Sequence, residues 1–320
     1  MKSCQEFNRK LNLLSKVVLS LKVGIPKGLL FYRYHNFYIT FFEELGLEIV
    51  LSPNTNKDIL NEGVRYCVDE ACVPMKIFHG HCAYLRDKCD FIFVPRIMKL
   101  YENEYICPKF CGLVEMVENS IPNMPTIISE PIYADSLKSL KKWAFKVGVK
   151  FTKNILVINK AFNTAVKKQN GYIGGLNDKE FKIKVALIGH PYNLYDSYIN
   201  MNLVEKLNKL GIGVITEEHI GRSYINKEVE KLFKKPFWTF ARNSYGFGAY
   251  MAENKLADGI IYASSFACGI DSVVVDLIKH RIEDFPFLEL KIDEQTGEAG
   301  FVTRLEAFTD MLKTKEAQVI

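Results

Sequence analysis

The stretch Lys22-Val-Gly-Ile-Pro-Lys-Gly28 sets the pattern from which the fold is predicted. Its first four residues have the apolar character of a short strand, and the proline and glycine that follow end that strand. An aromatic, helix-like segment at residues 34–45 comes next, Gly46 ends it, and Glu48–Leu51 is a second predicted strand. Two further buried strands are predicted at residues 90–95 (Asp-Phe-Ile-Phe-Val-Pro) and 125–129.

Helices are predicted between these strands from the helical spacing of apolar residues. Residues 74–85 suit a helix with Pro74 in its first turn. Apolar residues recur at helical spacing over residues 135–165, with lysines on much of the other face, which predicts a connecting helix with a solvated face. The turn-rich run Asn-Gly-Tyr-Ile-Gly-Gly at residues 170–175 then indicates a domain boundary.

The second half of the chain repeats the first. A predicted strand at residues 184–188 ends in Gly189-His190-Pro191, and the next strand is predicted at 213–216. Asp-Gly-Ile-Ile-Tyr at 258–262 corresponds to Asp-Phe-Ile-Phe-Val at 90–94. Phe287–Ile292 supplies a fourth strand, and residues 299–312 a closing helix.

Strands that alternate with helices predict an α/β fold with two Rossmann-like parallel-sheet domains. We expect a first domain at residues 1–134, which holds most of the cysteines, a connecting helical segment at 135–180 and a second domain at 181–320. Ligands of such folds lie beyond the carboxyl ends of the strands. Because Cys107 and Cys268 follow the third strand of each half, we expect both to face an interdomain cleft.

Composition limits the partners and the location. The 320 residues carry a formal charge of +5 but no arginine-rich tract or zinc-finger spacing, so nucleic acid is not an expected partner. The N-terminus is too polar for a signal peptide, and no apolar run is long enough to span a membrane. We therefore expect a cytoplasmic protein without a membrane partner, in which cysteines are thiols or metal ligands rather than disulfides.

Six of the eight cysteines lie between Cys67 and Cys111. Cys72 and Cys107 stand close before prolines, and Cys268 stands before a glycine where a strand gives way to a helix. We expect Asp271 or Ser272 to cap this helix through residues 273–278. Helix starts stabilise thiolates, and an iron–sulfur cluster needs thiolates from several points of the chain. Our hypothesis is that Cys72, Cys107 and Cys268 meet and hold such a cluster.

Other interpretations of the cysteines and histidines remain open. Cys4, Cys82 and Cys89 are interpreted as small buried hydrophobic residues. Structural zinc is a rival, but the chain has no Cys-x-x-Cys pair, and Cys67 and Cys111 form only looser pairs with Cys72 and Cys107. His79 and His81 are two positions apart on a predicted helix and point to different sides, which opposes binding of one ion.

Several motifs resemble the 2-hydroxyacyl-CoA dehydratase superfamily, and most closely its acyl-CoA dehydratase activase-related branch. The resemblance also extends to the D-component of 2-hydroxyglutaryl-CoA dehydratase. It covers residues 23–312, and the motifs that carry it are Gly-Ile-Pro-Lys-Gly-Leu-Leu-Phe-Tyr (24–32), Ala-Cys-Val-Pro-Met-Lys-Ile-Phe-His-Gly-His (71–81), Tyr-Ile-Cys-Pro-Lys-Phe (105–110), Ser-Ser-Phe-Ala-Cys-Gly-Ile-Asp-Ser (264–272) and the tail at 286–308.

This resemblance implies two Rossmann-like domains with a [4Fe–4S] or larger double-cubane cluster between them, as in proteins of anaerobic metabolism. By motif, the implied ligands are Cys72, Cys107 and Cys268, with Cys67 or Cys111 as further ligands. It also implies an ATP-hydrolysing activator protein with its own [4Fe–4S] cluster as electron donor. The chain departs from the family pattern at Ala267 and Ile270, where glycine and proline are expected.

Three functions follow as expectations. In the first, the cluster receives low-potential electrons from the activator and the chain reduces or dehydrates a small molecule or an acyl-CoA, as a homodimer or heterodimer. In the second, the chain is a non-catalytic scaffold or maturation partner of a dehydratase–activase complex. In the third, it is a zinc-stabilised interaction module. No acid or base is predicted, since Glu70, Lys76 and Glu298 are interpreted as structural.

Overall fold

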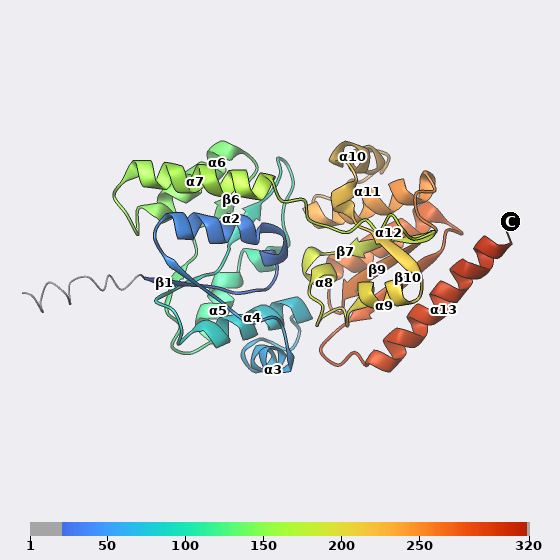
Figure 1. Ribbon diagram of the computed structural model, residues 1–320, viewed down its shortest axis with the longest axis horizontal. Coiled ribbons are helices and arrows are strands. Elements are labelled where there is room, and N and C mark those ends of the chain that lie inside the picture. The colour runs from blue at the N-terminus through green and yellow to red at the C-terminus, as the bar shows by residue number, and fades with distance from the viewer. Residues whose placement is uncertain (1–20, 319–320) are drawn as a thin grey trace, which may run out of the picture.

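The computed structural model describes residues 21–318 and contains two four-stranded parallel sheets that lie side by side (Figure 1). The first sheet has the order β2-β1-β3-β5 and consists of β1 (Lys22–Ile25), β2 (Glu48–Leu51), β3 (Phe91–Phe93) and β5 (Thr126–Ile128). The second has the order β10-β9-β7-β8 and consists of β7 (Ile183–Gly189), β8 (Ile212–Ile215), β9 (Gly259–Ser265) and β10 (Phe287–Ile292). In both sheets the first strand along the chain lies between the second and the third, which confirms the Rossmann-like α/β prediction.

The two halves have the same arrangement of strands, and one hydrogen bond occurs at the equivalent place in each. Asp90 precedes β3, and its Oδ2 accepts a hydrogen bond of 2.7 Å from the backbone nitrogen of Lys22 at the start of β1. Asp258 precedes β9, and its Oδ2 accepts a 2.7 Å bond from the backbone nitrogen of Lys184 at the start of β7. The internal repeat predicted from the sequence is therefore confirmed, and both halves begin their central strand pair in the same way.

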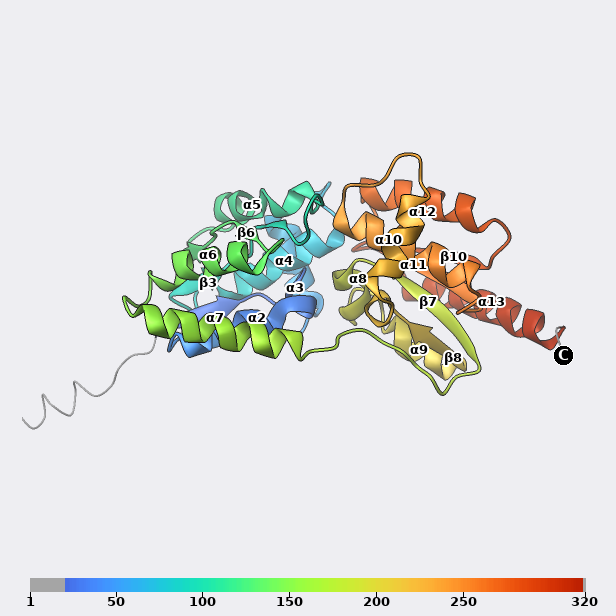
Figure 2. The ribbon, with the colours of Figure 1, turned by 90° about the horizontal axis from the view of Figure 1, so that it is seen from above.

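Helices cover the faces of the first sheet (Figures 1 and 2). They are α2 (Phe31–Glu44), α3 (Lys57–Tyr66), α4 (Val73–Leu85), the 3₁₀ turn η1 (Pro108–Phe110), α5 (Leu113–Ser120), α6 (Leu137–Gly148) and α7 (Ile155–Asn170). A small parallel pair, β4 (Ile97–Lys99) and β6 (Ile132–Tyr133), lies beyond the main sheet. We call residues 21–170 the first half of the chain and residues 183–318 the second half.

The second sheet is covered on both faces by apolar cores. Alternate residues of β7 point to opposite faces of the sheet, so Val185 and Leu187 pack into one core and Ala186 and Ile188 into the other. The helices of this half are α8 (Pro191–Tyr195), α9 (Leu203–Lys209), the 3₁₀ turn η2 (Glu217–His219), α10 (Arg222–Glu230), α11 (Thr239–Glu253), α12 (Gly269–Ile282) and α13 (Glu298–Ala317). No helix among residues 21–318 is both long enough and apolar enough to cross a membrane.

The single helix predicted at 135–165 is wrong, because this segment forms two helices. The side chain of Asn154 accepts hydrogen bonds from the backbone nitrogens of Leu156 and Val157 and so starts α7 as a new helix. Both helices pack on the first half, where the ring of Trp143 lies 5.3 Å from that of Phe41. The predicted domain boundaries at 134 and 180 remain predictions.

Helix α4 connects the cores of the two halves. All of its residues except Tyr84 are buried. Met75 and Phe78 pack into the core of the first half, whereas Val73 and Ile77 pack into the core beneath the second sheet. A helix that is apolar all round belongs in the interior. The first residue before α4 is Cys72, so this cysteine is placed at the junction of the halves.

Candidate metal centre

Cys72 is fixed by the close packing of α3 against α4. A Cβ atom at Gly63 would lie 2.0 Å from the carbonyl oxygen of Lys76, and one at Gly80 would lie 1.9 Å from that of Ile59. Only glycine allows the two backbones to approach in this way. Cys72 is the residue before α4, in extended conformation, with Pro74 in the first turn. The glycine contacts therefore set the position of the Cys72 thiol.

Cys107 is held in place by the second half of the chain. Its loop pairs with the segment before α11, since the nitrogen of Tyr105 donates to the carbonyl of Phe237 and Thr239 donates back to Tyr105, both at 2.8 Å. The buried carboxylate of Glu104 binds two arginines of the second half, Arg222 and Arg242. Cys107 itself precedes Pro108 at the start of η1. The loop that carries this thiol is thus anchored across the junction.

Cys268 is the residue before α12, three positions beyond the end of β9. The helix begins at Gly269, earlier than predicted, so neither Asp271 nor Ser272 is its cap. Asp271 instead lies in the first turn, where it is buried and its Oδ1 accepts a 2.8 Å hydrogen bond from Tyr262. Ala267 adopts a positive φ of 62°, a conformation that suits the glycine expected there from the family pattern.

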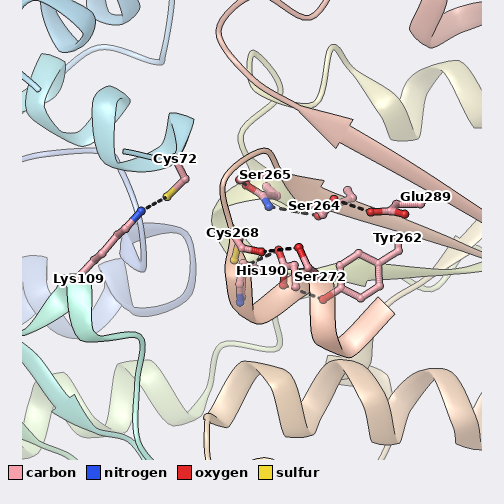
Figure 3. A network of polar contacts seen from close by, with 12 residues as sticks. Cys72, Lys109, His190, Tyr262, Ser264, Ser265, Cys268, Ser272 and Glu289 are labelled. Atoms are coloured by element: carbon pink, nitrogen blue, oxygen red, sulfur yellow. Dashed lines mark hydrogen bonds and ion pairs between the residues drawn. The ribbon is translucent and has the colours of Figure 1, made fainter. Parts of the chain in front are cut away.

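Figure 3 shows Cys72 and Cys268 on either side of the junction between the halves. The charges of Cys72 and Cys107 interact, as do those of Cys72 and Cys268, so the three thiols lie in one region. Burial raises the pKa of all three thiols, and the charge of Cys72 adds to this effect at both Cys107 and Cys268. Burial raises the pKa of Tyr192, and charges on the same three cysteines add to this effect, so its hydroxyl lies in the same region. That Cys72, Cys107 and Cys268 hold a metal cluster remains a prediction.

One cation lies directly against this site. Nζ of Lys109 in η1 donates a hydrogen bond of 3.7 Å to Sγ of Cys72 (Figure 3). Lys109 lowers the pKa of Cys72, but burial outweighs it and leaves that pKa raised. For Cys268, burial together with the charge of Asp271 raises the pKa to about 12. Thiols of this kind are protonated at neutral pH and are poor nucleophiles, whereas a bound metal would displace their protons.

The remaining candidate residues have structural partners. His79 Nδ1 bonds the carbonyl of Met75 at 2.7 Å and His81 Nε2 bonds Thr55 Oγ1 at 3.1 Å, so each histidine has a structural partner of its own. Buried Lys76 pairs with Glu294, and Glu298 pairs with Lys206 at 2.7 Å. These contacts agree with the structural roles expected for Lys76 and Glu298.

The other cysteines differ in their surroundings. Cys82 is fully buried in the first core, and Cys89 donates to the carbonyl of Leu85 at 3.3 Å. Burial raises the pKa of Cys67 to about 11, and the charge of Cys72 contributes, so Cys67 lies near the site. Cys111 follows η1. Cys4 lies outside the described residues.

Sequence reasoning missed two residues that the structure adds to the site. His190 and Asp271 are both buried, and one possible ligand atom from each of His190, Cys268 and Asp271 lies within 4.8 Å of the others. His190 precedes Pro191 as Cys107 precedes Pro108, and this shared His-Pro and Cys-Pro pattern at helix starts is the signal that could have revealed it.

Residues 22–220 match the family described as CoA enzyme activase uncharacterised domain (DUF2229). The chain belongs to this family. The match supports the activase-related resemblance, while the likeness to a dehydratase D-component remains a prediction. The family's matched range includes Cys72, Cys107 and His190, and it ends before Cys268. No curated protein matches the chain.

Proposed function

We propose that the chain is an iron–sulfur protein of a CoA dehydratase system. It receives low-potential electrons from an ATP-hydrolysing activator and passes them to a small molecule or an acyl-CoA. The observation that carries this proposal is the meeting of Cys72, Cys107 and Cys268, from distant parts of the sequence, in one half-buried site. Membership of a family named for a CoA enzyme activase supports the dehydratase setting.

The spacing of the ligand atoms favours a cluster over one zinc ion. Ligands of a tetrahedral zinc ion, with bonds of about 2.3 Å to sulfur, lie only about 3.8 Å apart. Within residues 21–318, the one group of three His, Cys, Asp or Glu ligand atoms within 4.8 Å of one another is His190, Cys268 and Asp271. Cys72 and Cys107 are outside this group, so the three thiols do not all lie within 4.8 Å of one another. Ligands of a multi-iron cluster bind different iron atoms and so need not converge on one ion.

Each residue around the site has a distinct role in this proposal. The three cysteines would hold the cluster, which when bound supplies one-electron transfer. Lys109 donates to Cys72 and offsets the negative charge of the thiolates. Tyr192 and Phe240, which are buried, limit the access of water. Loss of water from such a site raises the strength of the electrostatic interactions within it.

An apolar groove beside Cys268 fits a protein partner. It has a volume of about 390 Å³ and lies between α12 and the segment at residues 234–238 that precedes α11, beginning at Gly269 next to the cysteine. Val273 and Phe237 are largely exposed there, and Lys234 and Lys235 flank them. An acidic surface with apolar residues would complement this groove. We place the electron donor here because the groove adjoins a cluster ligand.

The test is reduction of the protein by the activator. Anaerobic protein with its metal group is mixed with reduced activator and ATP, and the reduced-state EPR signal is followed. We expect the signal to rise with ATP and not with ADP, and to rise more slowly in Lys234→Glu/Lys235→Glu protein. Chemical reduction by dithionite controls for the integrity of the variant. A signal that forms with dithionite but never with activator and ATP would contradict the proposed electron path.

A further inference from the structure

His190 emerges beside Cys268 because of the strand order. Strands β7 and β9 are adjacent, and their register pairs Gly189 with Ala263. His190 directly follows β7, and Cys268 lies after β9. Both residues are therefore beyond the carboxyl ends of neighbouring parallel strands. His190 is 3 % exposed, and its ring packs between Tyr192 and Phe240 at centroid distances of 5.1 and 5.2 Å. The imidazole is therefore fixed at the cysteine site (Figure 3).

Asp271 lies beside this imidazole. Its Oδ1 accepts the hydroxyl of Tyr262 at 2.8 Å, and its Oδ2 lies 3.6 Å from Nδ1 of His190. Oδ2 is buried and accepts no hydrogen bond within residues 21–318. A carboxylate on one ring nitrogen fixes the proton there and leaves the other nitrogen free as a metal ligand. Because the carboxylate lies nearest Nδ1, Nε2 is the nitrogen that this arrangement leaves for a metal.

His190 also shares its backbone setting with the cysteines. His190 (φ −69°, ψ 145°) and Cys72 (φ −63°, ψ 150°) have nearly the same conformation, and each precedes a helix with proline in its first turn. Cys107 has φ −49° and ψ 132° and also precedes a proline. Extended conformation before proline is expected on steric grounds for His190 and Cys107. Cys72 is followed by Val73 and has this conformation as the residue before a helix. The protein thus presents a histidine in the way it presents two of the proposed ligands.

From this arrangement we infer that His190 is the fourth protein ligand of the metal group held by Cys72, Cys107 and Cys268, with Asp271 as its positioning residue. The inference rests on the proposed function. It assigns to His190 the position of fourth ligand, for which the sequence offered Cys67 or Cys111. Four protein ligands leave no open iron for substrate, and imidazole in place of thiolate raises the reduction potential. The metal group would then transfer electrons and would not bind a substrate oxygen directly.

The direct test is pulsed EPR on the reduced, wild-type protein made with natural histidine and with ¹⁵N-labelled histidine. A coordinated imidazole gives a strong nitrogen hyperfine coupling that changes with the isotope. We expect this coupling in wild type and in His219→Ala, whose histidine is exposed, and its loss in His190→Ala. This readout needs no turnover, and the wild-type measurement needs no variant to fold.

A second variant separates ligation from packing. His190→Cys offers a thiolate at the same position, so we expect wild-type iron and sulfide content, no histidine coupling and a lower reduction potential. Absence of isotope-sensitive coupling in iron-loaded wild type, or its persistence in His190→Ala, would overturn the assignment of His190 and leave the proposed function intact. Wild type without iron would instead overturn both.

Discussion

Cys72 of the first half and Cys268 of the second half lie in one site, although most of the chain separates them in sequence (Figure 3). After burial and the charge of Asp271, the charge of Cys72 is a further cause of the raised pKa of Cys268. Each residue immediately precedes a helix, α4 or α12, that is packed into a core. The junction of the two halves is therefore also the place where the candidate ligands meet.

Removal of any one of the three cysteines tests the ligand set. In Cys72→Ala, Cys107→Ala and Cys268→Ala we expect the iron content to fall to below about a tenth of wild type, since ligand loss removes much of the binding free energy. Cys82→Ala and Cys89→Ala are the matched controls, because both residues have other packing roles. Iron and sulfide analysis after anaerobic reconstitution measures the effect. Full loading of all three site variants would rule out this ligand set.

Lys109 is expected to tune the reduction potential. Its ammonium donates to Cys72 and favours the more negative, reduced form, so Lys109→Gln should lower the potential by roughly 40 mV, the one-electron equivalent of about 1 kcal/mol. Lys109→Arg keeps the charge and should stay close to wild type. A redox titration followed by EPR gives both values. Equal potentials in Lys109→Gln and wild type would show that Lys109 has no such effect.

Glu104 is expected to hold the loop of Cys107 to the second half. Glu104→Gln removes the charge that faces Arg222 and Arg242, and we expect a loss of about 2 kcal/mol in the free energy of unfolding. The exposed Glu102 on the same loop provides the control Glu102→Gln, for which we expect little change. Urea unfolding of the metal-free proteins makes the comparison. Equal stability of the two variants would contradict the anchoring role.

His81 gives a pH dependence that is separate from the metal site. Burial and then the charge of Lys27 lower its pKa to about 3, so the folded state keeps the imidazole neutral. Its contribution to stability is complete above the unfolded pKa of about 6.5 and is lost as the pH falls toward 3. From pH 6.5 to pH 5 this loss is about 2 kcal/mol, or about 1.4 kcal/mol for each pH unit.

The variant His81→Gln should lack this part of the acid sensitivity. Urea unfolding of wild type and variant at pH 6.5 and pH 5 should show a difference in stability that shrinks by about 2 kcal/mol at the lower pH. Thr55 Oγ1 bonds both His81 and Asp196, and glutamine at position 81 offers Thr55 a polar partner, so that the hydrogen bond from Thr55 to Asp196 is kept in the comparison. A stability difference that is independent of pH would contradict a buried, neutral His81.

The strands could be predicted because their signals are local. Strand β1 is a short apolar run ended by Pro26, β7 ends at Gly189, and β1, β2 and β10 have the predicted bounds. Helix α11 was missed because its interior contains Gly246 and Gly248, which lower helix propensity. A Cβ atom at Gly246 would lie 2.3 Å from the carbonyl oxygen of Ile225, so close packing against α10 overrides that propensity.

The site could be predicted only in part. Cys72, Cys107 and Cys268 carry recognisable local patterns, whereas the approach of His190 and Asp271 depends on which strands are neighbours. The adjacency of β7 and β9, and the buried hydroxyl of Tyr262 that binds Asp271, are tertiary facts. A lone buried histidine more often packs than binds metal, so the His190-Pro191 pattern alone was too weak a signal to select His190.

The measurement that tests the central claim most directly is metal analysis of protein purified without oxygen. Iron, acid-labile sulfide and zinc are determined beside the visible spectrum and the EPR spectrum of the dithionite-reduced protein. The account predicts iron and sulfide in similar amounts, little zinc and an EPR signal that appears on reduction by one electron. Stoichiometric zinc without sulfide, or folded protein that stays metal-free after reconstitution with iron and sulfide, would contradict it.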